Sequence, residues 1–576
     1  MSVINRFNLI VELISKDIEM HTIVNHILAL GLLVISTASA LSQDTWVKVF
    51  GGSSREYING FTPHSDGGYI FWGGTMGKDG DFGSKFWQGE CYPPFISRSF
   101  FLCRTDKKGD VIWRVVFGEQ DNHTYLYHVG STTDGGDIFV GRAKYSHYPY
   151  AQYSWNTYRC NPFLMDVRGE DDILIMKVSR HGTLEWTRNI GGSKSEWTYI
   201  RGWRSGFQSA SSILLASDHL IVSGYTCSND RDFEGMNKGE CDVFLVCLRP
   251  DGRILWKKTF GGAEYDGVES IAMEGSALVI TGETSSIDGD FRRHKSLPGS
   301  DSFKLQIDTN GNLLSKWYPN GSEAGYPNDW SVRDKFTMKN EESIVITDTT
   351  DGPGTYSPEW KRHVLVMRFD STRVMKTRNV IRGSGDDIGV TTLQAESGEY
   401  YVVGTTSSDD GDFSGLRKSG VDFSGNPTTD VFVAKYDRND RRILLRKYGG
   451  SNTDEISTVV QTREGDLLLI GSTMSDDGVF ESRNRGESDV YILKIDSTGQ
   501  VLWSRTYGGR GLDEPVTGRV TSDNGIMILG TTTSDVGDQF NDGDFNGLGK
   551  GQSDIFIMKL DANGNLKPTV SGSKTK

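Results

Sequence analysis

Basic residues are in short supply in this sequence: 62 Lys and Arg stand against 76 Asp and Glu, which gives a formal net charge of −14. Binding to nucleic acid or to an anionic membrane needs basic patches, so this balance argues against both. Helical periodicity is absent, and no segment after residue 40 is long and apolar enough to span a membrane. The composition fits a soluble chain, or one that collects cations.

Recognisable catalytic signatures are also absent. The sequence contains no G-x-S-x-G elbow, no H-E-x-x-H motif and no phosphate-binding P-loop. Its ten His are scattered and form no pair at metal-ligand spacing. These absences predict that the chain binds a ligand and is not an enzyme.

Cysteine is scarce, and its spacing matches no zinc site. In an exported chain the cysteines can form disulfides. Cys227 and Cys241 flank one loop, and so do Cys91 and Cys103, which makes both pairs candidate bridges. The six cysteines all lie in the first half of the chain: Cys91, Cys103, Cys160, Cys227, Cys241 and Cys247.

The N-terminal residues look like an export signal. Residues 24–40 hold an apolar core and end in the A-x-A cleavage signal of residues 38–40, so the mature chain is expected to start near Leu41. Met20 is a better start for such a signal than Met1. Residues 1–40 are therefore assigned to an upstream extension and signal peptide, with a membrane anchor as the alternative. The protein is expected to be secreted, periplasmic or on the cell surface.

The sequence is dominated by one degraded repeat of roughly 60–70 residues, clearest in the segment WSRTYGG. Two copies, near Thr377 and Leu445, have lost the Trp that opens the segment. A period of this length, rich in strand patterns, predicts a β-propeller or an array of β-units. Six copies keep the Trp, at Trp46, Trp113, Trp186, Trp256, Trp317 and Trp503.

Each copy of the repeat reads as four strands, which fall in one copy at residues 444–448, 456–461, 467–473 and 489–496. Eight such units predict an all-β, eight-bladed β-propeller of four-stranded blades, with seven blades as the alternative. The mature chain starts on a Trp strand and the last unit lacks one, so pairing of the terminal strands is expected to close the ring. Residues 41–566 are assigned to the propeller and residues 567–576 to a disordered tail.

The pattern D-x-x-G-x-x-x-W at Asp496, Gly499 and Trp503 resembles the tryptophan-docking repeat of quinoprotein dehydrogenase propellers. The resemblance implies that each Trp packs against the Gly between neighbouring blades, and that the Trp strand is the outermost of its blade. The adjacent Cys-Cys pair of those enzymes is missing, so no quinone cofactor is expected. With its GGSxxDE, DGGY and GxTxSxDGDF segments, the unit also resembles secreted bacterial β-propeller repeat proteins of the Bacteroidetes surface type. That likeness covers nearly all the mature chain and says almost nothing about activity.

Acidic residues follow the Gly-Gly pairs and are expected near the mouth of the central channel. Carboxylate oxygens bind hard cations such as calcium, which makes these groups one candidate site. Alternatively, each carboxylate accepts hydrogen bonds from backbone N–H groups of its own tight turn. In a third interpretation two of them are the acid and base of a polysaccharide-cleaving enzyme. The residues are Glu56, Glu196, Asp266, Asp386, Asp387, Asp454, Glu455, Asp513 and Glu514.

A second acidic pattern, DGDF, occurs four times, with DRDF at residues 230–233 as a variant. Closely spaced acidic oxygens around a Gly resemble part of a calcium loop, although the ligand spacing of an EF-hand is missing. The Phe is expected to plug the loop into the edge of the blade. Calcium ligands are predicted at Asp79, Asp81, Asp288, Asp290, Asp410, Asp412, Asp542 and Asp544.

Aromatic residues gather where longer loops interrupt the repeat, in blades one to three and at Tyr356 and Trp360 of blade five. Aromatic loops suit stacking against sugars or contact with a protein partner. The alternative is that these loops fold back and form a satellite core. Ligand-binding residues are predicted at Trp87, Tyr148, Tyr150, Tyr153, Trp155, Trp197 and Trp203.

These features together predict a secreted, monomeric, non-enzymatic β-propeller that binds a glycan or a protein partner through the aromatic loops of blades one to three. The alternatives are a polysaccharide-acting enzyme with carboxylates at the channel mouth, and a purely structural surface module. Calcium is the one cofactor expected. No nucleic-acid partner and no membrane span in the mature chain are expected.

Overall fold

The computed structural model describes residues 45–64, 66–77, 79–83, 87–88, 98–120, 125–144, 171–197, 213–216, 219–292, 301–317, 332–337, 342–350, 361–370, 375–395, 397–422, 424–480, 484–534, 543–545 and 548–566. The predicted signal peptide and the predicted C-terminal tail lie outside these residues. Among the helices of the described residues, none is long and apolar enough to cross a membrane.

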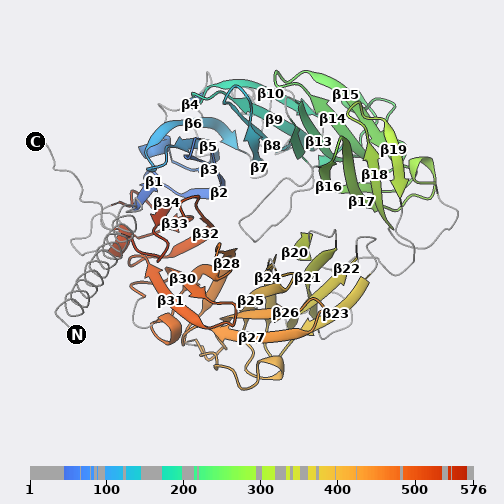
Figure 1. Cartoon of the computed structure of the whole chain (residues 1–576). Coiled ribbons are helices and arrows are strands. Elements are labelled where there is room, and N and C mark those ends of the chain that lie inside the picture. The colour runs from blue at the N-terminus through green and yellow to red at the C-terminus, as the bar shows by residue number, and fades with distance from the viewer. Residues whose placement is uncertain are drawn as a thin grey trace, which may run out of the picture.

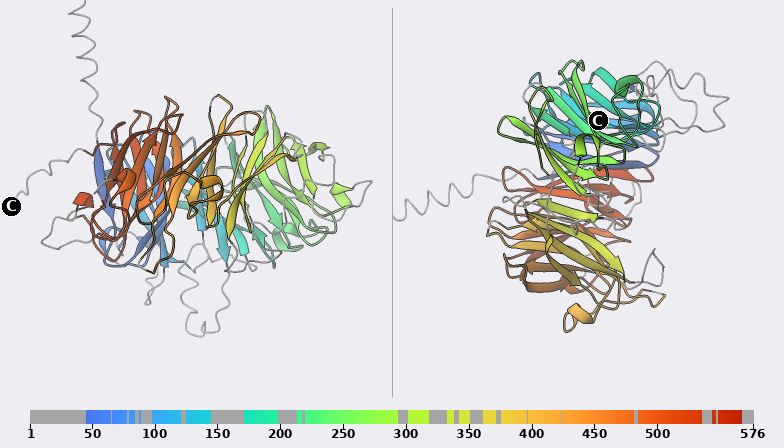
Figure 2. Two further views of the ribbon diagram at one scale, coloured as in Figure 1. Left: turned by 90° about the horizontal axis from the view of Figure 1, so that it is seen from below. Right: turned by 90° about the vertical axis from the view of Figure 1, so that its right-hand side faces the viewer.

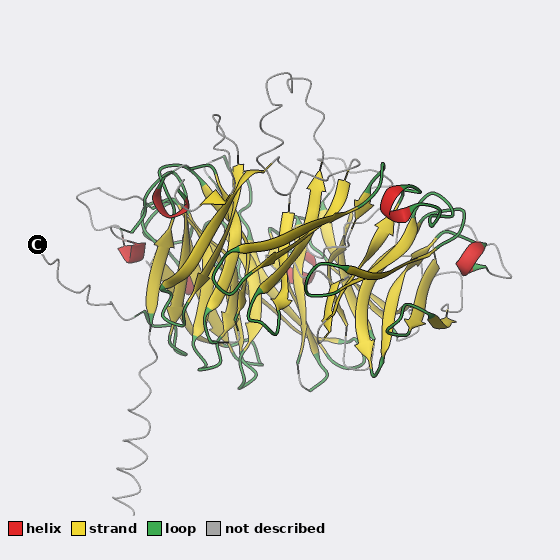
Figure 3. Cartoon of the chain, turned by 90° about the horizontal axis from the view of Figure 1, so that it is seen from above, coloured by secondary structure: helices red, strands yellow, loops and turns green. Residues whose placement is uncertain are grey.

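Eight sheets, each built on four antiparallel strands, are arranged in a ring around a central axis (Figure 1). Seen edge-on, the ring is a flat disc (Figure 2), and the strands run between its two faces (Figure 3). The chain is therefore an eight-bladed β-propeller, as the repeat predicts, and the seven-bladed alternative is wrong.

The first four blades follow one another along the chain. Blade 1 consists of β2 (Glu56–Pro63), β3 (Tyr69–Thr75), β5 (Arg98–Thr105) and β6 (Val111–Gln120), with the short β4 (Trp87–Gln88) beyond β6. Blade 2 consists of β7 (Tyr125–Ser131), β8 (Asp137–Lys144), β9 (Asp171–Val178) and β10 (Leu184–Ile190). Blade 3 consists of β11 (Glu196–Trp197) and β12 (Ile213–Ala216), then β13 (His219–Thr226), β14 (Asp242–Leu248) and β15 (Ile254–Phe260). Blade 4 consists of β16 (Asp266–Glu274), β17 (Ala277–Thr284), β18 (Asp301–Ile307) and β19 (Leu313–Trp317).

The second four blades return to the start of the chain. Blade 5 consists of β20 (Val332–Thr337), β21 (Ser343–Thr350), β22 (Arg362–Phe369) and β23 (Met375–Ile381). Blade 6 consists of β24 (Asp387–Gln394), β25 (Tyr400–Thr406), β26 (Asp430–Tyr436) and β27 (Arg442–Tyr448). Blade 7 consists of β28 (Asp454–Gln461), β29 (Leu467–Thr473), β30 (Asp489–Ile495) and β31 (Val501–Tyr507). Blade 8 consists of β32 (Asp513–Val520), β33 (Ile526–Thr532), β34 (Asp554–Leu560) and β1 (Trp46–Phe50).

The middle strands of each blade are apolar on both faces, because each blade packs against two neighbours. In β30, Val490 and Ile492 pack toward blade 8, whereas Tyr491 and Leu493 pack toward blade 6. Successive strand residues point to opposite faces, so a strand buried on both sides reads as a continuous apolar run. This is why the run at residues 467–473 could be recognised as a buried strand before the structure was known.

The two ends of the propeller meet in blade 8. β1 pairs antiparallel with β34, in register from Trp46 opposite Lys559 to Phe50 opposite Ile555. The indole of Trp46 lies against Gly109 of blade 1, where an added β-carbon would come within 2.5 Å of the ring. The predicted closure of the ring by its terminal strands is therefore confirmed.

The tryptophan-docking arrangement implied by the resemblance is also confirmed. Six outermost strands carry the Trp, and five of these Trp rings each cover a glycine in the last turn of the next blade, which leaves no room for a side chain there. These glycines have positive φ, a conformation that favours glycine. The pairs are Trp46 with Gly109, Trp113 with Gly182, Trp186 with Gly252, Trp256 with Gly311, and Trp503 with Gly564.

Apolar clusters fill the spaces between blades. Seven of the eight clusters combine residues of two neighbouring blades. The eighth, around Leu365 and Met367, contains residues of blade 5 alone among those described. In blade 4 the strand face turned toward blade 5 carries Lys304 at the position where β30 carries Ile492. This charged side chain accounts for the absence of a shared apolar cluster among the described residues of the junction.

One of the two candidate disulfides forms. Cys227 and Cys241 are bonded and tie together the ends of the loop between β13 and β14. Cys103 is a free, fully buried thiol on β5, so the predicted Cys91–Cys103 bridge is wrong. The alternation of β5 turns Cys103 into the apolar cluster between blades 8 and 1.

Candidate functional site

Two sets of loops meet at one face of the ring, which we call the clasp face. One set joins the outermost strand of a blade to the innermost strand of the next and contains the Gly-Gly pair. The other joins the second and third strands of a blade and contains the DGDF segment. Because alternate strands run in opposite directions, both sets lie at the same end of the sheets.

The Gly-Gly loops are held by the acidic residue that opens the next innermost strand. In blade 8 the backbone N–H of Gly509 donates to Asp513 Oδ2 at 2.7 Å, and Ser534 Oγ donates to the same oxygen at 2.9 Å. These acidic side chains are buried, and the interpretation in which each stabilises its own turn is confirmed. The same backbone contact is made by Glu56, Glu196, Asp266, Asp387 and Asp454.

The DGDF segments fasten a second loop onto the Gly-Gly loop. In blade 4, Asp288 Oδ1 accepts from the backbone N–H of Ala263 at 2.8 Å, and Asp290 Oδ2 accepts from that of Gly261 at 3.0 Å. Gly289 between them has a φ of +56° and packs against the backbone of Gly261, which excludes a side chain. Phe291 is fully buried, so the predicted plug is confirmed.

The predicted calcium ligands of the DGDF segments have protein partners in this structure. Besides backbone N–H groups, they contact basic side chains: Arg114 lies 2.7 Å from Asp81, and Arg442 lies 2.6 Å from Asp412. In the described part of the chain no three His, Cys, Asp or Glu side chains are grouped so that they could hold a metal ion. Asp542 lies outside the described residues. Calcium binding therefore stays a prediction that needs a direct test.

Burial dominates the electrostatics of the clasp face. It raises the pKa of Glu56 and of Asp454 to about 7, although hydrogen bonds from Thr75 and Thr473 respectively favour the charged forms. At the exposed start of a DGDF segment the pKa shift has the opposite direction. For Asp79 the backbone N–H of Ser53 holds the carboxyl pKa below its usual range. Burial thus favours the protonated form of these two inner acids, whereas a backbone hydrogen bond favours the charged form of the outer Asp79.

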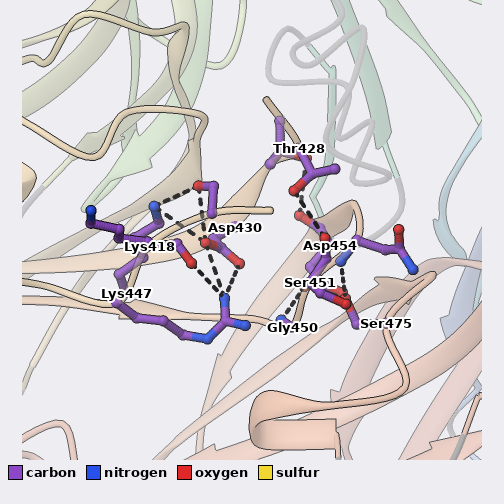
Figure 4. Close-up of polar contacts among 12 residues, drawn as sticks. Lys418, Thr428, Asp430, Lys447, Gly450, Ser451, Asp454 and Ser475 are labelled. Carbon is purple, nitrogen blue, oxygen red and sulfur yellow. Dashed lines mark hydrogen bonds and ion pairs between the residues drawn. The ribbon is translucent and has the colours of Figure 1, made fainter. Parts of the chain in front are cut away.

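The junction between blades 6 and 7 carries additional basic side chains (Figure 4). The fully buried ammonium of Lys447 lies 3.2 Å from Asp430 and 2.8 Å from Asp409. Arg417 lies 3.2 Å from Asp430 on the other side. Asp454, which opens β28, accepts from the N–H of Gly450 at 2.6 Å in the same view. This junction shows how a buried acid of the ring can be neutralised by a cation of the chain.

Few acidic groups of the Gly-Gly loops remain exposed for chemistry. Glu455 and Glu514 are exposed on the innermost strands of blades 7 and 8. Asp386 is half-exposed, accepts from the N–H of Arg362 at 3.0 Å and is paired with its guanidinium. The other six predicted channel-mouth carboxylates are buried in the hydrogen bonds described above. Burial of this kind suits a scaffold and gives a substrate no access to these six groups.

The aromatic residues predicted to bind a ligand are only partly described. Trp87 lies on β4, which pairs parallel with β6 at the outer edge of blade 1. Trp197 lies on β11, the innermost strand of blade 3, opposite Tyr225. The structure therefore places these two on opposite edges of their blades. The remaining predicted residues, Tyr148, Tyr150, Tyr153, Trp155 and Trp203, lie outside the described residues.

The described residues that flank the insertion of blade 2 lie at the clasp face. The insertion of blade 2 leaves and re-enters at Lys144 and Asp171, which pair with each other at the end of β8 and β9. Sequence reasoning missed two aromatic residues nearby. Tyr225 and Tyr265 meet edge to face with ring centroids 5.3 Å apart, at the junction of blades 3 and 4. Their sequence signal is weak, because each is a single aromatic residue next to a loop.

Comparison with known proteins gives one relative by sequence. No family model matches the chain. The regulatory protein FlaEY of Caulobacter vibrioides (strain ATCC 19089 / CIP 103742 / CB 15) is 30% identical over 390 residues, which make up 62% of this chain and 38% of that protein. The chain thus spans well under half the length of this relative.

Solved structures similar to this chain include hydrolases and a protease propeller. Puromycin hydrolase is 11% identical, with a TM-score of 0.35 over 84% of this chain and 60% of that one. The β-propeller domain of the Trilobed protease from Pyrococcus furiosus is 7% identical, with a TM-score of 0.28 over 79% of this chain and 99% of that one. Prolyl oligopeptidase B from Galerina marginata is 9% identical, with a TM-score of 0.31 over 72% and 46% of the two chains. Identities and TM-scores this low carry no argument about activity.

Proposed function

We propose that this propeller is a non-enzymatic binding protein whose clasp face meets a glycan or a protein partner through the aromatic insertions of blades 1 to 3. The acids of the repeat hold loops together, so the repeat itself is a scaffold. The insertions are where the chain departs from the scaffold, and those of blades 1 and 2 leave and re-enter between the second and third strands, at the clasp face. Aromatic side chains on such a face offer stacking surfaces for sugars and anchors for a protein partner.

This proposal rests on the hydrogen bonds that the acidic residues of the repeat accept. Six of the nine carboxylates expected at the channel mouth are buried and accept hydrogen bonds from the Gly-Gly loops. An acid–base pair for glycoside hydrolysis must reach both faces of a sugar ring, which buried side chains cannot do. Binding by the inserted loops therefore accounts for the arrangement better than catalysis does.

The name of the sequence relative agrees with a binding role. FlaEY of Caulobacter vibrioides is called a regulatory protein, and regulation commonly works through recognition of a partner. Only 38% of that protein is matched, so its role supports the choice of binding over catalysis and does not identify the ligand.

The proposal is tested with residues 41–576, the predicted mature chain, on a glycan array. A variant carrying Tyr150→Ala and Trp155→Ala should lose binding by roughly 10- to 100-fold, the loss expected for one or two aromatic anchors. Leu314→Ala serves as the matched control, because Leu314 is exposed on the outermost strand of blade 4, outside the insertions. Absence of any glycan signal for the wild type would remove the glycan version. Protein capture that the aromatic variant retains in full would remove the protein version.

Calcium binding by the DGDF segments is a second, separable part of the proposal. An ion that binds only the folded chain raises its melting temperature, by the equivalent of about 2.7 kcal/mol when its concentration is one hundred times the dissociation constant. We therefore expect a higher melting temperature in millimolar calcium than in chelator. Asp288→Asn, Asp410→Asn and Asp79→Asn together should reduce that difference, because they remove a ligand from three of the four segments. Identical melting curves in calcium and in chelator would dismiss calcium as a ligand.

A further inference from the structure

Two buried carboxylates flank a single glycine where blade 7 meets blade 8. A β-carbon added to Gly508 would lie 2.5 Å from Asp489 Oδ1 and 2.7 Å from Asp513 Oδ2. Asp489 opens the third strand of blade 7, and Asp513 opens the first strand of blade 8. Both side chains are fully buried. Asp489 Oδ1 has no hydrogen-bond partner among the described residues.

The same arrangement recurs around the ring. At each of these junctions the first glycine of the Gly-Gly pair would bring an added β-carbon within 3 Å of the acid from the preceding blade. In the described residues the Oδ1 atoms of Asp242 and Asp554 are also without a hydrogen-bond partner. The pairs are Asp172 with Glu196, Asp242 with Asp266, Asp430 with Asp454, Asp489 with Asp513, and Asp554 with Glu56.

Two neighbouring buried carboxylates cannot both stay charged without a large free-energy cost, because water no longer screens them. A proton shared between them removes one charge and supplies a donor for an oxygen that otherwise has none. Burial raises the pKa of Asp489 to about 7, and the charge of Asp513 adds to this effect. Burial likewise raises the pKa of Asp242 to about 7, and Asp266 adds to it.

Other charged groups also face these pairs. Around Asp489 they are Arg485, whose backbone N–H donates to Asp489 Oδ2 at 3.2 Å, and Asp544 of the adjacent loop. Around Asp242 they are Lys238 and Asp290, which are ion-paired with each other. At both junctions the basic group thus has a second acid to neutralise.

At the junction with blade 1, Asp554 is faced by Lys550 and by Asp81, which contact each other. Its partner Glu56 is faced by Asp79 as well. Lys550, the basic group that faces Asp554, is therefore shared with Asp81.

The junction of blades 6 and 7 differs from the others, because basic side chains of the protein neutralise its acid pair. There Lys447 and Arg417 both contact Asp430, at 3.2 Å each, and Lys447 is fully buried (Figure 4). The residue equivalent to Lys447 is Thr506 at the junction of blades 7 and 8, and Thr259 at that of blades 3 and 4. Neither Thr can carry a charge, so a proton is the neutralising group that remains.

We propose that each of these buried acid pairs, apart from Asp430 with Asp454, holds one proton, and that these shared protons make the propeller a pH-sensitive ring, more stable in mild acid and less stable at alkaline pH. Because the folded-state pKa lies above that of the unfolded chain, the folded ring binds more protons between about pH 4 and about pH 7. The stability that these protons supply is therefore present at pH 4, falls as the pH rises through this window, and is constant above it.

The test is the melting temperature of the mature protein from pH 5 to pH 8, with and without chelator. We expect a fall of roughly 5 °C or more between pH 5 and pH 8 in both cases. Asp489→Asn with Asp242→Asn replaces two shared protons by amide N–H donors. This variant should melt higher than the wild type at pH 8 and show a smaller pH dependence. Unfolding at pH 6 should also release protons from the wild type, measured as buffer-dependent heat, and fewer from the variant.

Asp430→Asn is the matched control, because its junction already holds Lys447 and Arg417. This change should lower the melting temperature at both pH values. The proposal is overturned if the wild type has the same melting temperature at pH 5 and pH 8. It is also overturned if the double variant melts below the wild type at pH 8 by as much as it does at pH 5. It is also overturned if calcium at pH 8 removes the pH dependence, since a cation would then occupy the place of the proton.

Discussion

Replacing Lys447 by Met should lower the free energy of unfolding by about 3–5 kcal/mol, the cost of leaving a buried charge without its partner. The ammonium of Lys447 is fully buried and lies within hydrogen-bonding distance of Asp409 and Asp430, of Ser419 Oγ at 2.6 Å and of the Ser408 carbonyl at 3.0 Å. Met fills similar space but donates no hydrogen bond, so Asp409 and Asp430 lose the ammonium between them and Asp430 keeps only Arg417. Chemical denaturation at pH 7 measures the effect.

Two variants separate the ion pair from simple packing. Lys447→Met combined with Asp430→Asn should recover part of the loss, because the buried acid is then neutral. Lys48→Met provides the matched surface control, since Lys48 pairs with Asp110 at 2.8 Å where both are exposed, and it should cost less than about 1 kcal/mol. Equal costs for Lys447→Met and Lys48→Met would contradict the description of the junction.

Trp46→Ala should destabilise the propeller by about 3–5 kcal/mol, as expected for loss of a buried indole. Trp46 is 4% exposed, covers Gly109 of blade 1 and lies on the strand that closes the ring. Its loss removes the contact that holds β1 between blades 8 and 1. We also expect faster hydrogen exchange of the β34 amides, because β34 pairs directly with β1.

Trp503→Ala is the control for the effect of closure. Trp503 covers Gly564 in the same way, but it lies within a continuous blade and is only half-buried. Its removal should cost less and leave exchange at β34 unchanged. If Trp46→Ala melts like the wild type, closure by the terminal strands contributes little to stability, and the account of the fold would need revision.

Much of the fold could be predicted because the sequence pattern of one blade recurs eight times. The run at residues 467–473 matches β29 at both ends, and the start of β1 was recognised from Trp46 alone. The predicted strand at 456–461 falls two residues short of β28, because Asp454 and Glu455 were attributed to the preceding turn. A buried Asp at the start of a strand looks in sequence like a polar turn residue.

The acid pairs between blades could not be predicted, because their members come from different blades. Asp489 and Asp513 are 24 residues apart, and nothing in either local pattern shows that one glycine separates them. The available signal was the Asp that opens an otherwise apolar third strand, as in Asp489–Ile495 and Asp554–Leu560. Cys103 misled the disulfide prediction for a related reason, since burial between blades is a tertiary property.

The central claim is that the repeat is a scaffold and that binding resides in the inserted loops. The most direct test replaces residues 145–170 by a short Gly-Ser turn, which can join Lys144 to Asp171 because these two residues pair across β8 and β9. The account predicts a variant with the melting temperature of the wild type and without its ligand binding, measured on the same glycan array and capture assay. A variant that no longer folds, or one that binds as the wild type does, would contradict it.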